Sequence, residues 1–234
     1  MSNSTPNDFR YVLMPGKASF ESGQLQSHNQ AFEYWQNFWA DILMEVTGER
    51  RKLLADDFSR QDCIAILYHQ NEIIGMHAYS FLNLASKAAT EHSYFKKYFN
   101  VEFLEQLTKR ECHTVMTMEY FSLSKKWQGK DVGISLAKVI ACLGLRLAEA
   151  MAMDGSITAA RSDVPAALLA RKLGAIAIGD AIKVHNIPTE LMLFPADSAK
   201  EPTDTEVQNW IKILWQRRID LTGFSYDKIL TKIA

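Results

Sequence analysis

The sequence has little of what marks secreted or membrane-spanning proteins. Its three cysteines, Cys63, Cys112 and Cys142, are odd in number, widely spaced and set among apolar residues. This pattern argues against a disulfide framework or a metal knuckle, and it predicts buried thiols in a reducing compartment. The chain opens without a basic segment followed by an apolar run, and it contains no uncharged stretch long enough to span a bilayer. We therefore expect a cytoplasmic location.

A large net charge of either sign is also missing. The 26 basic and 27 acidic residues leave a formal net charge of −1, so no global field attracts nucleic acid, a membrane or a polyanion. Any anion site must be a local cluster. Internal repeats and low-complexity tracts are absent, and the composition, 47% hydrophobic and 23% charged, is that of an ordinary globular protein. With 234 residues the chain suits one large domain with appendages.

Several short segments have the β-prone composition expected of strands. They lie at 63–68, 73–81, 114–123, 157–160, 175–178 and 182–194. The first two are separated by four polar residues and predict a hairpin. The last is expected to break near Pro188, because proline cannot donate a ladder hydrogen bond.

Other segments repeat apolar residues at helical spacing. They lie at about 29–46, about 132–153 and 207–214, with one more suggested at 226–233. A short helix would be capped by Asp163 and ended by Gly174. A charged, aromatic-rich helical segment at about 84–112 looks inserted, as segments that shape a binding pocket often are. We expect one domain over 1–195 and a C-terminal helical extension over 196–234 packed on it.

The segment that bears on chemistry is Trp127-Gln128-Gly129-Lys130-Asp131-Val132-Gly133-Ile134, where a strand gives way to a helix. A helix N-terminus offers unpaired N–H groups and a partial positive charge, and glycines let an anion approach the backbone. Lys125, Lys126 and Lys130 surround the turn and can add charge-assisted contacts to phosphates. The pattern fits a pyrophosphate site, but by itself it is more often that of a solvated loop.

This segment resembles motif A of the GNAT superfamily of N-acyltransferases, in which a Gln or Arg, two residues, Gly, one residue and Gly or Ala precede a long helix. Gln128 and Gly133 match the first and last positions, whereas Asp131 stands where the middle glycine is usual. The similarity extends to Glu72-Ile73-Ile74-Gly75-Met76 and to Ser162–Gly174, and the order of elements agrees over roughly 63–194. The resemblance implies an α/β fold of the α+β kind, with a mixed, mostly antiparallel sheet flanked by helices and splayed between its fourth and fifth strands.

The resemblance also implies the binding site. The donor would be acetyl-CoA or another acyl-CoA, with its pantetheine arm in the splayed gap and its amides facing Leu123 and Ser124. The residues implied for the pyrophosphate are Gln128, Gly129, Lys130, Val132 and Gly133. No metal is implied, because the acceptor amine attacks the thioester carbonyl directly. That reaction requires a base for the amine and an acid for the leaving thiolate.

Glu119 is the candidate base. Strand alternation puts it on the face of Thr117 and Phe121, where a partly desolvated carboxylate is suited to take up a proton. The alternative is a structural carboxylate held by neighbouring donors. Many superfamily members carry a Tyr as the acid in the helix after the fifth strand, but the matching residue here is Ala170. Tyr120 or a water molecule would have to replace it.

Three functions stay open. The first is transfer of acetyl or another short acyl group from CoA to a small amine or amino acid that the sequence does not identify. The second is that of N-acyl amino acid synthases and acyl-homoserine-lactone synthases, which accept long chains from acyl carrier protein. The aromatic insert would then line a channel, and an acidic carrier would meet Lys96, Lys97, Lys109 and Arg110. The third is a catalytically silent CoA-binding module, which the departures at Asp131 and Ala170 allow.

Other conspicuous residues have simpler interpretations. Three isolated histidines show no ligand spacing and are expected in the core or at sheet edges; they are His77, His113 and His185. The aromatic stripe of the first helix is interpreted as core rather than as a tunnel for an acyl chain; it consists of Phe32, Trp35 and Trp39.

Overall fold

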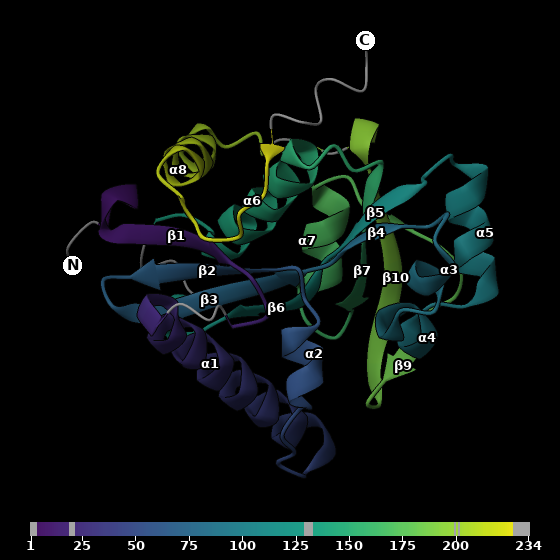
Figure 1. Cartoon of the computed structure of the whole chain (residues 1–234), viewed down its shortest axis with the longest axis horizontal. Coiled ribbons are helices and arrows are strands. Elements are labelled where there is room, and N and C mark those ends of the chain that lie inside the picture. Colours follow the sequence, from purple (N-terminus) through teal and green to yellow (C-terminus); the bar gives the residue numbers. More distant parts are fainter. Residues whose placement is uncertain (1–3, 19–21, 129–132, 199, 201, 227–234) are drawn as a thin grey trace. The chain divides into compact units, whose positions relative to one another are not determined.

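The computed structural model describes residues 4–18, 22–128, 133–198, 200 and 202–226. The chain divides into two compact units. The first comprises Met1–Ser80, Tyr120–Gly144 and Pro202–Phe224, and the second comprises Phe81–Glu119, Leu145–Glu201 and Ser225–Ala234. Each unit has its own sheet and its own hydrophobic core (Figure 1). Helices and mixed sheets occur in both, so the predicted α/β class is confirmed.

The first unit is built on a five-stranded sheet in the order β11-β1-β2-β3-β6. Its elements are η1 (Pro6–Asp8), β1 (Phe9–Met14), α1 (Ser22–Thr47), α2 (Ala55–Ser59), β2 (Cys63–His69), β3 (Glu72–Tyr79), β6 (Glu119–Leu123), η2 (Lys125–Trp127), the start of α6 (Leu136–Ala150), α8 (Thr205–Gln216) and β11 (Ile219–Asp220). β1, β2 and β3 are antiparallel neighbours, and β11 runs parallel to β1. The hairpin predicted over 63–81 is therefore confirmed as β2 and β3.

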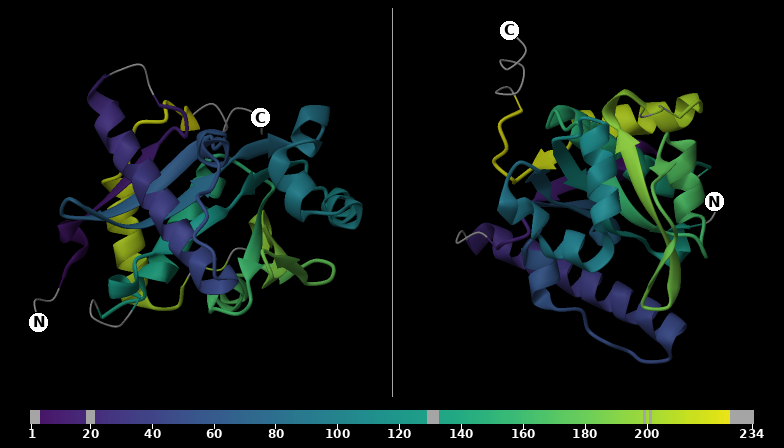
Figure 2. Two further views of the ribbon diagram at one scale, coloured as in Figure 1. Left: turned by 90° about the horizontal axis from the view of Figure 1, so that it is seen from below. Right: turned by 90° about the vertical axis from the view of Figure 1, so that its right-hand side faces the viewer.

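Helix α1 crosses one face of this sheet (Figure 1, Figure 2). Its Trp35 is only 1% exposed and packs with Phe58 and the sheet, and Phe32 and Trp39 pack against the same cluster. The interpretation of this aromatic stripe as core is thus confirmed. Helix α8 packs on β1 through Trp210, whose ring centroid lies 5.0 Å from that of Phe9.

The close approach of α6 to the first sheet depends on Gly75, in the β3 segment that resembles the GNAT superfamily. A Cβ atom at this position would lie 2.5 Å from Ile140 Cδ1 and 3.0 Å from the carbonyl oxygen of Ser122. Contacts this short to a packed helix and to a strand backbone leave no room for a side chain. Gly75 therefore lets α6 pack directly behind β3 and β6.

The second unit is built on a sheet in the order β4-β5-β7-β10-β8, with β9 paired to β10. Its elements are β4 (Phe81–Asn83), α3 (Lys87–Thr90), α4 (Ser93–Tyr98), α5 (Val101–Lys109), β5 (Thr114–Thr117), the end of α6, β7 (Gly155–Arg161), α7 (Ala166–Lys172), β8 (Ile176–Ala177), β9 (Ile182–Val184), β10 (Ile187–Pro195) and η3 (Ala196–Ser198). β5 and β7 are parallel, and the other pairs are antiparallel.

The predicted helical insert forms α3, α4 and α5, which build the core of the second unit. Phe95 and Phe103 are 1% exposed and Phe99 is 8% exposed. These rings pack with Val115 and Ile157 of the sheet. Helix α7 packs on β7 and β10 from the other side (Figure 1). The aromatic residues of the insert are therefore explained by burial against the sheet.

The prediction of one strand over 114–123 is wrong. β5 pairs with β4 and β7, β6 neighbours β3, and Met118 separates the two strands. The Met118 N–H donates to the carbonyl of Ile157 at 2.8 Å. Two residues later Tyr120 has a φ of 54°, a left-handed conformation that a bulky side chain rarely adopts. Side-chain alternation is interrupted here, so the shared face proposed for Glu119 and Phe121 does not follow.

The last strand also breaks elsewhere than predicted. The turn between β9 and β10 is at His185 and Asn186, both with positive φ (50° and 65°), and Pro188 lies inside β10. The carbonyl of Pro188 accepts the N–H of Ser162. In an antiparallel ladder the N–H and C=O of one residue point to the same neighbour, so the proline removes no bond between β9 and β10.

Among the helices, α1 starts seven residues before the predicted Asn29, because its first turns are polar except for the exposed Leu25 and show no apolar repeat. α8 buries the predicted residues Val207, Trp210, Ile211 and Leu214. Asp163 does not cap α7: its carboxylate accepts hydrogen bonds from Arg161, and Pro165 occupies the N-cap. The helix predicted at 226–233 lies almost wholly outside the described residues.

The splay between the fourth and fifth strands and the domain boundary at 195 both stay predictions. Across the described ranges, no helix combines the length and the apolar character that crossing a membrane requires.

Candidate functional site

The end of β6 leads into the turn that the sequence predicts as a phosphate site. The N–H of Ser124 donates to the carbonyl of Ile74 in β3 at 2.8 Å, and the Ser124 carbonyl accepts the N–H of Trp127 at 2.8 Å. The last residue of the predicted pantetheine strand is therefore fixed to its neighbour on one side and to η2 on the other. Both backbone groups are already used within the protein.

Gln128 holds this turn onto the strand. Its Nε2 donates to the carbonyl oxygen of Leu123 at 2.7 Å. The side-chain amide thus closes the turn from Leu123 to Gln128, and its oxygen is left as an acceptor. The predicted role of Gln128 at the pyrophosphate stays a prediction, and the structure adds a positioning role.

Trp127 anchors the same turn and was not singled out by the sequence. Its ring centroid lies 5.6 Å from that of Phe9 and 4.6 Å from that of His69. Aromatic pairs at these separations stabilise packing beyond simple burial. The available signal was an aromatic residue two positions before Gly129, but its partners come from β1 and β2.

Of the five residues implied for the pyrophosphate, Gln128 and Gly133 are described, while Gly129, Lys130 and Val132, together with Asp131, lie outside the described residues. Gly133 has a φ of 77°, in the left-handed region, and a Cβ atom there would meet nothing within 4 Å. Glycine is favoured at this position by its backbone conformation and not by crowding. The open space leaves its backbone accessible.

Two lysines predicted near the phosphates are engaged elsewhere. Lys125 pairs with Glu45 of α1, and Lys126 Nζ lies 3.5 Å from a carboxylate oxygen of Glu72 in β3. All four side chains are at least half exposed. Such surface pairs contribute little to stability and exchange readily. An anion at the turn would therefore compete with the two carboxylates for these lysines.

A phenol lies at the same strand end. Tyr34 of α1 donates to the carbonyl of Ile74 at 3.3 Å. Burial raises the pKa of Tyr34 to about 12, against smaller opposing effects of hydrogen bonding with Ser122 and Ser124. Tyr34 therefore keeps its proton at neutral pH and serves as a hydrogen-bond donor beside the predicted pantetheine strand.

Next to these residues the first unit has a surface cavity of about 450 Å³. Its lining comes from α1, the following loop and the turn after β6. The residues are Phe38, Asp41, Ile42, Met44, Glu45, Arg50, Ser124, Lys125 and Gln128. Two residues predicted for donor binding, Ser124 and Gln128, thus border an open cavity.

The candidate base belongs to the second unit. Glu119 is 4% exposed, and its Oε1 accepts a hydrogen bond from Thr117 Oγ1 at 2.9 Å. The chain between them is held in place by Met118, whose carbonyl accepts Thr158 Oγ1 at 2.9 Å. A carboxylate that is buried and oriented by a hydroxyl donor fits either a base or a structural group.

The next residues are the candidates for the acid that protonates the leaving thiolate. Tyr120, in the first unit, packs edge-on against Trp35 and Trp39 with centroid separations of 5.3 and 5.6 Å. Ala170 is buried in α7 of the second unit and carries no proton donor. In that unit the Tyr94 hydroxyl, which the sequence did not single out, accepts the N–H of Ala159 in β7 at 3.0 Å.

The isolated histidines behave as expected. His77 is buried in β3 against Tyr79 and Phe121, and burial lowers its pKa to about 3, so it is neutral. His113 and His185 are exposed at the ends of strands. Within the described ranges, no three His, Cys, Asp or Glu side chains come together as a metal site would require.

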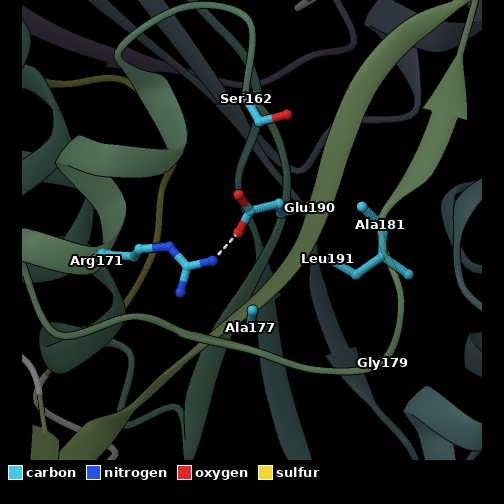
Figure 3. A pocket seen from close by; sticks show the side chains of 7 residues that line it. All are labelled: Ser162, Arg171, Ala177, Gly179, Ala181, Glu190 and Leu191. Atoms are coloured by element: carbon cyan, nitrogen blue, oxygen red, sulfur yellow. Dashed lines mark hydrogen bonds and ion pairs between the residues drawn. The ribbon is translucent and has the colours of Figure 1, made fainter.

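A second, smaller cavity of about 200 Å³ lies in the second unit (Figure 3). Arg171 of α7 and Glu190 of β10 form an ion pair across it, with Ser162 nearby. The two charges neutralise each other, and none of the predicted site residues lines this cavity. We interpret it as a packing gap between α7 and the sheet.

No family model and no curated protein matches this sequence. Solved structures do match. BjaI, a CoA-dependent acyl-homoserine lactone synthase solved with SAM and isopentyl-CoA, aligns with a TM-score of 0.60 at 8% identity, covering 97% of this chain and 100% of BjaI. FeeM, an N-acyl amino acid synthase from uncultured soil microbes, aligns with a TM-score of 0.53 at 10% identity, covering 81% of this chain and 92% of FeeM.

Acetyltransferases match as well. The polyamine N-acetyltransferase of Drosophila melanogaster aligns with a TM-score of 0.52 at 10% identity, covering 79% of this chain and 98% of that enzyme. Identities this low establish the fold and nothing finer. The chain therefore has a GNAT-like fold, the one that N-acetyltransferases share with N-acyl amino acid synthases and acyl-homoserine lactone synthases.

Proposed function

We propose that this protein is an N-acyltransferase that moves an acyl group from a CoA thioester to the nitrogen of a small acceptor. The observation that carries the proposal is the likeness to acyltransferases over almost the whole chain, up to 97% of it. The sequence supports it independently, because the segment resembling motif A falls where β6 turns toward α6. All three cysteines are buried, and buried thiols suit a reducing compartment such as the cytoplasm.

In this proposal the donor lies along the end of β6 and the following turn. Leu123 and Ser124 contact the pantetheine arm, and the pyrophosphate is held by Gln128, Gly129, Lys130, Val132 and Gly133. Two features support the assignment. The bond from Gln128 to Leu123 fixes the start of the turn, and the left-handed backbone of Gly133 precedes a long helix whose N-terminus suits an anion.

The reaction is direct transfer. The acceptor nitrogen attacks the thioester carbonyl carbon, the carbon–sulfur bond breaks, and an amide forms. The nitrogen gives one proton to a base, and the departing thiolate takes up one proton. We assign the base to Glu119, because its buried carboxylate is oriented by Thr117. The proton for the thiolate comes from Tyr120 or a water molecule, since Ala170 has none to give.

We propose acetyl-CoA or another acyl-CoA as the donor in preference to acyl carrier protein. Between residues 87 and 111 the insert carries five basic residues and four acidic ones, a net charge of only +1. One of the four cations proposed to meet a carrier, Lys96, is paired with Glu91 at 2.9 Å. A nearly neutral surface gives little electrostatic attraction to an acidic carrier protein.

The test is release of free thiol from acetyl-CoA in the presence of an amine pool, with mass spectrometry of the acylated product. The proposal predicts amine-dependent thiol release and an intact CoA product. Binding of CoA without any release would instead indicate the silent binding module. A strong, salt-sensitive preference for acyl carrier protein over CoA would contradict the choice of donor.

A further inference from the structure

Tyr94 of the helical insert has a buried hydroxyl at the edge of β7. It belongs to α4, which begins at an N-cap where His92 Nδ1 accepts the N–H of Tyr94 at 3.3 Å. The rings of Tyr98 and Phe99 pack against the Tyr94 ring with centroid separations of 5.3 and 5.1 Å. Tyr94 is 4% exposed, so its neighbours hold the ring in one orientation.

The Tyr94 hydroxyl reaches the backbone of β7 where the neighbouring strand β5 ends. The N–H of Met118 donates to the carbonyl of Ile157 at 2.8 Å, and after Met118 the chain continues into β6. Backbone groups of residues i and i+2 in a strand point to the same side, so the N–H of Ala159 points to the side that β5 has left. There the Tyr94 oxygen accepts it at 3.0 Å. Thr158 and Ala159 are partly exposed at this point, whereas Ile157 is buried.

The proposed base is tied to the same part of β7. Glu119 directly follows Met118, whose carbonyl accepts Thr158 Oγ1 at 2.9 Å. Thr158 and Ala159 are consecutive, so one residue of β7 holds the chain before Glu119 and the next holds Tyr94. All of these residues belong to the second unit. Acyl transfer needs a base and an acid at one thioester, and this edge of β7 brings a carboxylate and a phenol together.

The bond from Ala159 suits the phenol to proton donation. By accepting an N–H, the Tyr94 oxygen uses a lone pair, and its own hydrogen is still a donor. An N–H donated to the oxygen also favours the phenolate that is left after the proton has been transferred. Ala170 of α7, at the position of the usual acid, has no proton to give.

We propose that Tyr94 is the general acid that protonates the departing thiolate. This inference rests on the proposed acyl transfer and names a proton source in place of Tyr120 or a water molecule. As the carbon–sulfur bond breaks, its electron pair goes to the sulfur, which takes the proton of the Tyr94 hydroxyl and leaves as the free thiol of CoA. The acceptor nitrogen gives its proton to Glu119. Glu119 then releases a proton to solvent and the phenolate takes one up, so both groups are restored.

The first test is Tyr94→Phe, which keeps the ring and removes only the hydroxyl. At saturating acetyl-CoA and amine, kcat for thiol release should fall about a hundredfold or more, as loss of a general acid does, while CoA affinity stays at the wild-type value. The matched control is Tyr98→Phe on the same helix, which should turn over as wild type. Wild-type turnover in Tyr94→Phe, or a hundredfold loss in Tyr120→Phe with none in Tyr94→Phe, overturns the proposal.

A second test separates catalysis from a structural role, since Tyr94→Phe also leaves the N–H of Ala159 without its acceptor. Incorporation of 3-fluorotyrosine at position 94 keeps the hydroxyl but makes it more acidic, so the alkaline limb of the pH profile of kcat should move to lower pH. The same replacement of Tyr98 should not move it. An unmoved limb for position 94 makes Tyr94 a structural cap of β7 and overturns this inference alone. Wild-type protein that binds CoA but releases no thiol removes the proposed function and this inference with it.

Discussion

Truncating Phe103 separates a core from an acyl channel in the helical insert. The ring is 1% exposed and its centroid lies 4.5 Å from that of Phe99. Replacing a buried phenylalanine with alanine removes apolar contacts and leaves a void, at a cost of about 3–5 kcal/mol in the free energy of unfolding. For a chain of this length that corresponds to a fall of roughly 6–20 °C in the midpoint of thermal unfolding. Circular dichroism during heating measures it.

The matched control is Val101→Ala on the same helix. Val101 is 72% exposed, so its truncation should change the free energy of unfolding by less than about 0.5 kcal/mol. The more conservative Phe103→Leu keeps a folded enzyme for assay, and its ratio of kcat/KM for octanoyl-CoA and acetyl-CoA should match wild type. The reasoning is refuted if Phe103→Ala melts within about 2 °C of wild type and selectively loses long acyl donors.

Three further changes test the site and its surroundings. Glu119→Gln should lower turnover about a hundredfold or more without weakening CoA binding, as loss of a general base does; unchanged turnover with an unchanged pH profile makes the carboxylate structural. Gln128→Ala should reduce CoA affinity about fivefold in calorimetry, since it removes one hydrogen bond that positions the turn, and wild-type affinity would dismiss that role. His77 has its pKa lowered from 6.5 to about 3 by burial. The unfolded chain therefore binds a proton that the folded chain refuses, and stability should fall by up to about 1.4 kcal/mol per pH unit as pH drops from 6.5 toward 3. His77→Phe should remove this component from urea unfolding curves, and identical pH dependence would contradict the assignment.

Much of the fold follows from periodicity. The aromatic face of α1 and the apolar stripe of α8 repeat at helical spacing, and the structure buries both. The hairpin of β2 and β3 follows instead from two β-prone runs separated by polar residues. The resemblance carried by β3 and by the turn after β6 predicted the GNAT-like fold that the solved structures share. In the structure Gly75 allows the close approach of α6, and Gly133 has a left-handed backbone.

The failures are equally local. Nothing in the sequence marks the break at Met118, because the residues on both sides are β-prone and the left-handed conformation of Tyr120 is carried by a residue that seldom adopts it. Pro188 predicted a break in the last strand, but the proline lies within β10 and removes no hydrogen bond between β9 and β10. The partners of Trp127 and Tyr34, and the cavity lined by α1, arise from residues distant in sequence, which single-sequence patterns do not pair.

The most direct test of the central claim is stabilisation by CoA. Ligand binding to the folded state raises stability by RT ln(1 + [L]/Kd), about 2.7 kcal/mol at a hundred times Kd. Gly133→Glu should abolish the gain, because it adds a carboxylate at the proposed phosphate turn. Gly223→Glu is the control, since Gly223 has a similar φ of 72° and equally open space around it. Wild type and Gly223→Glu should melt at higher temperature as CoA is added, while Gly133→Glu should not. No response in the wild type, or an equal response in Gly133→Glu, would contradict a CoA site at the turn between β6 and α6.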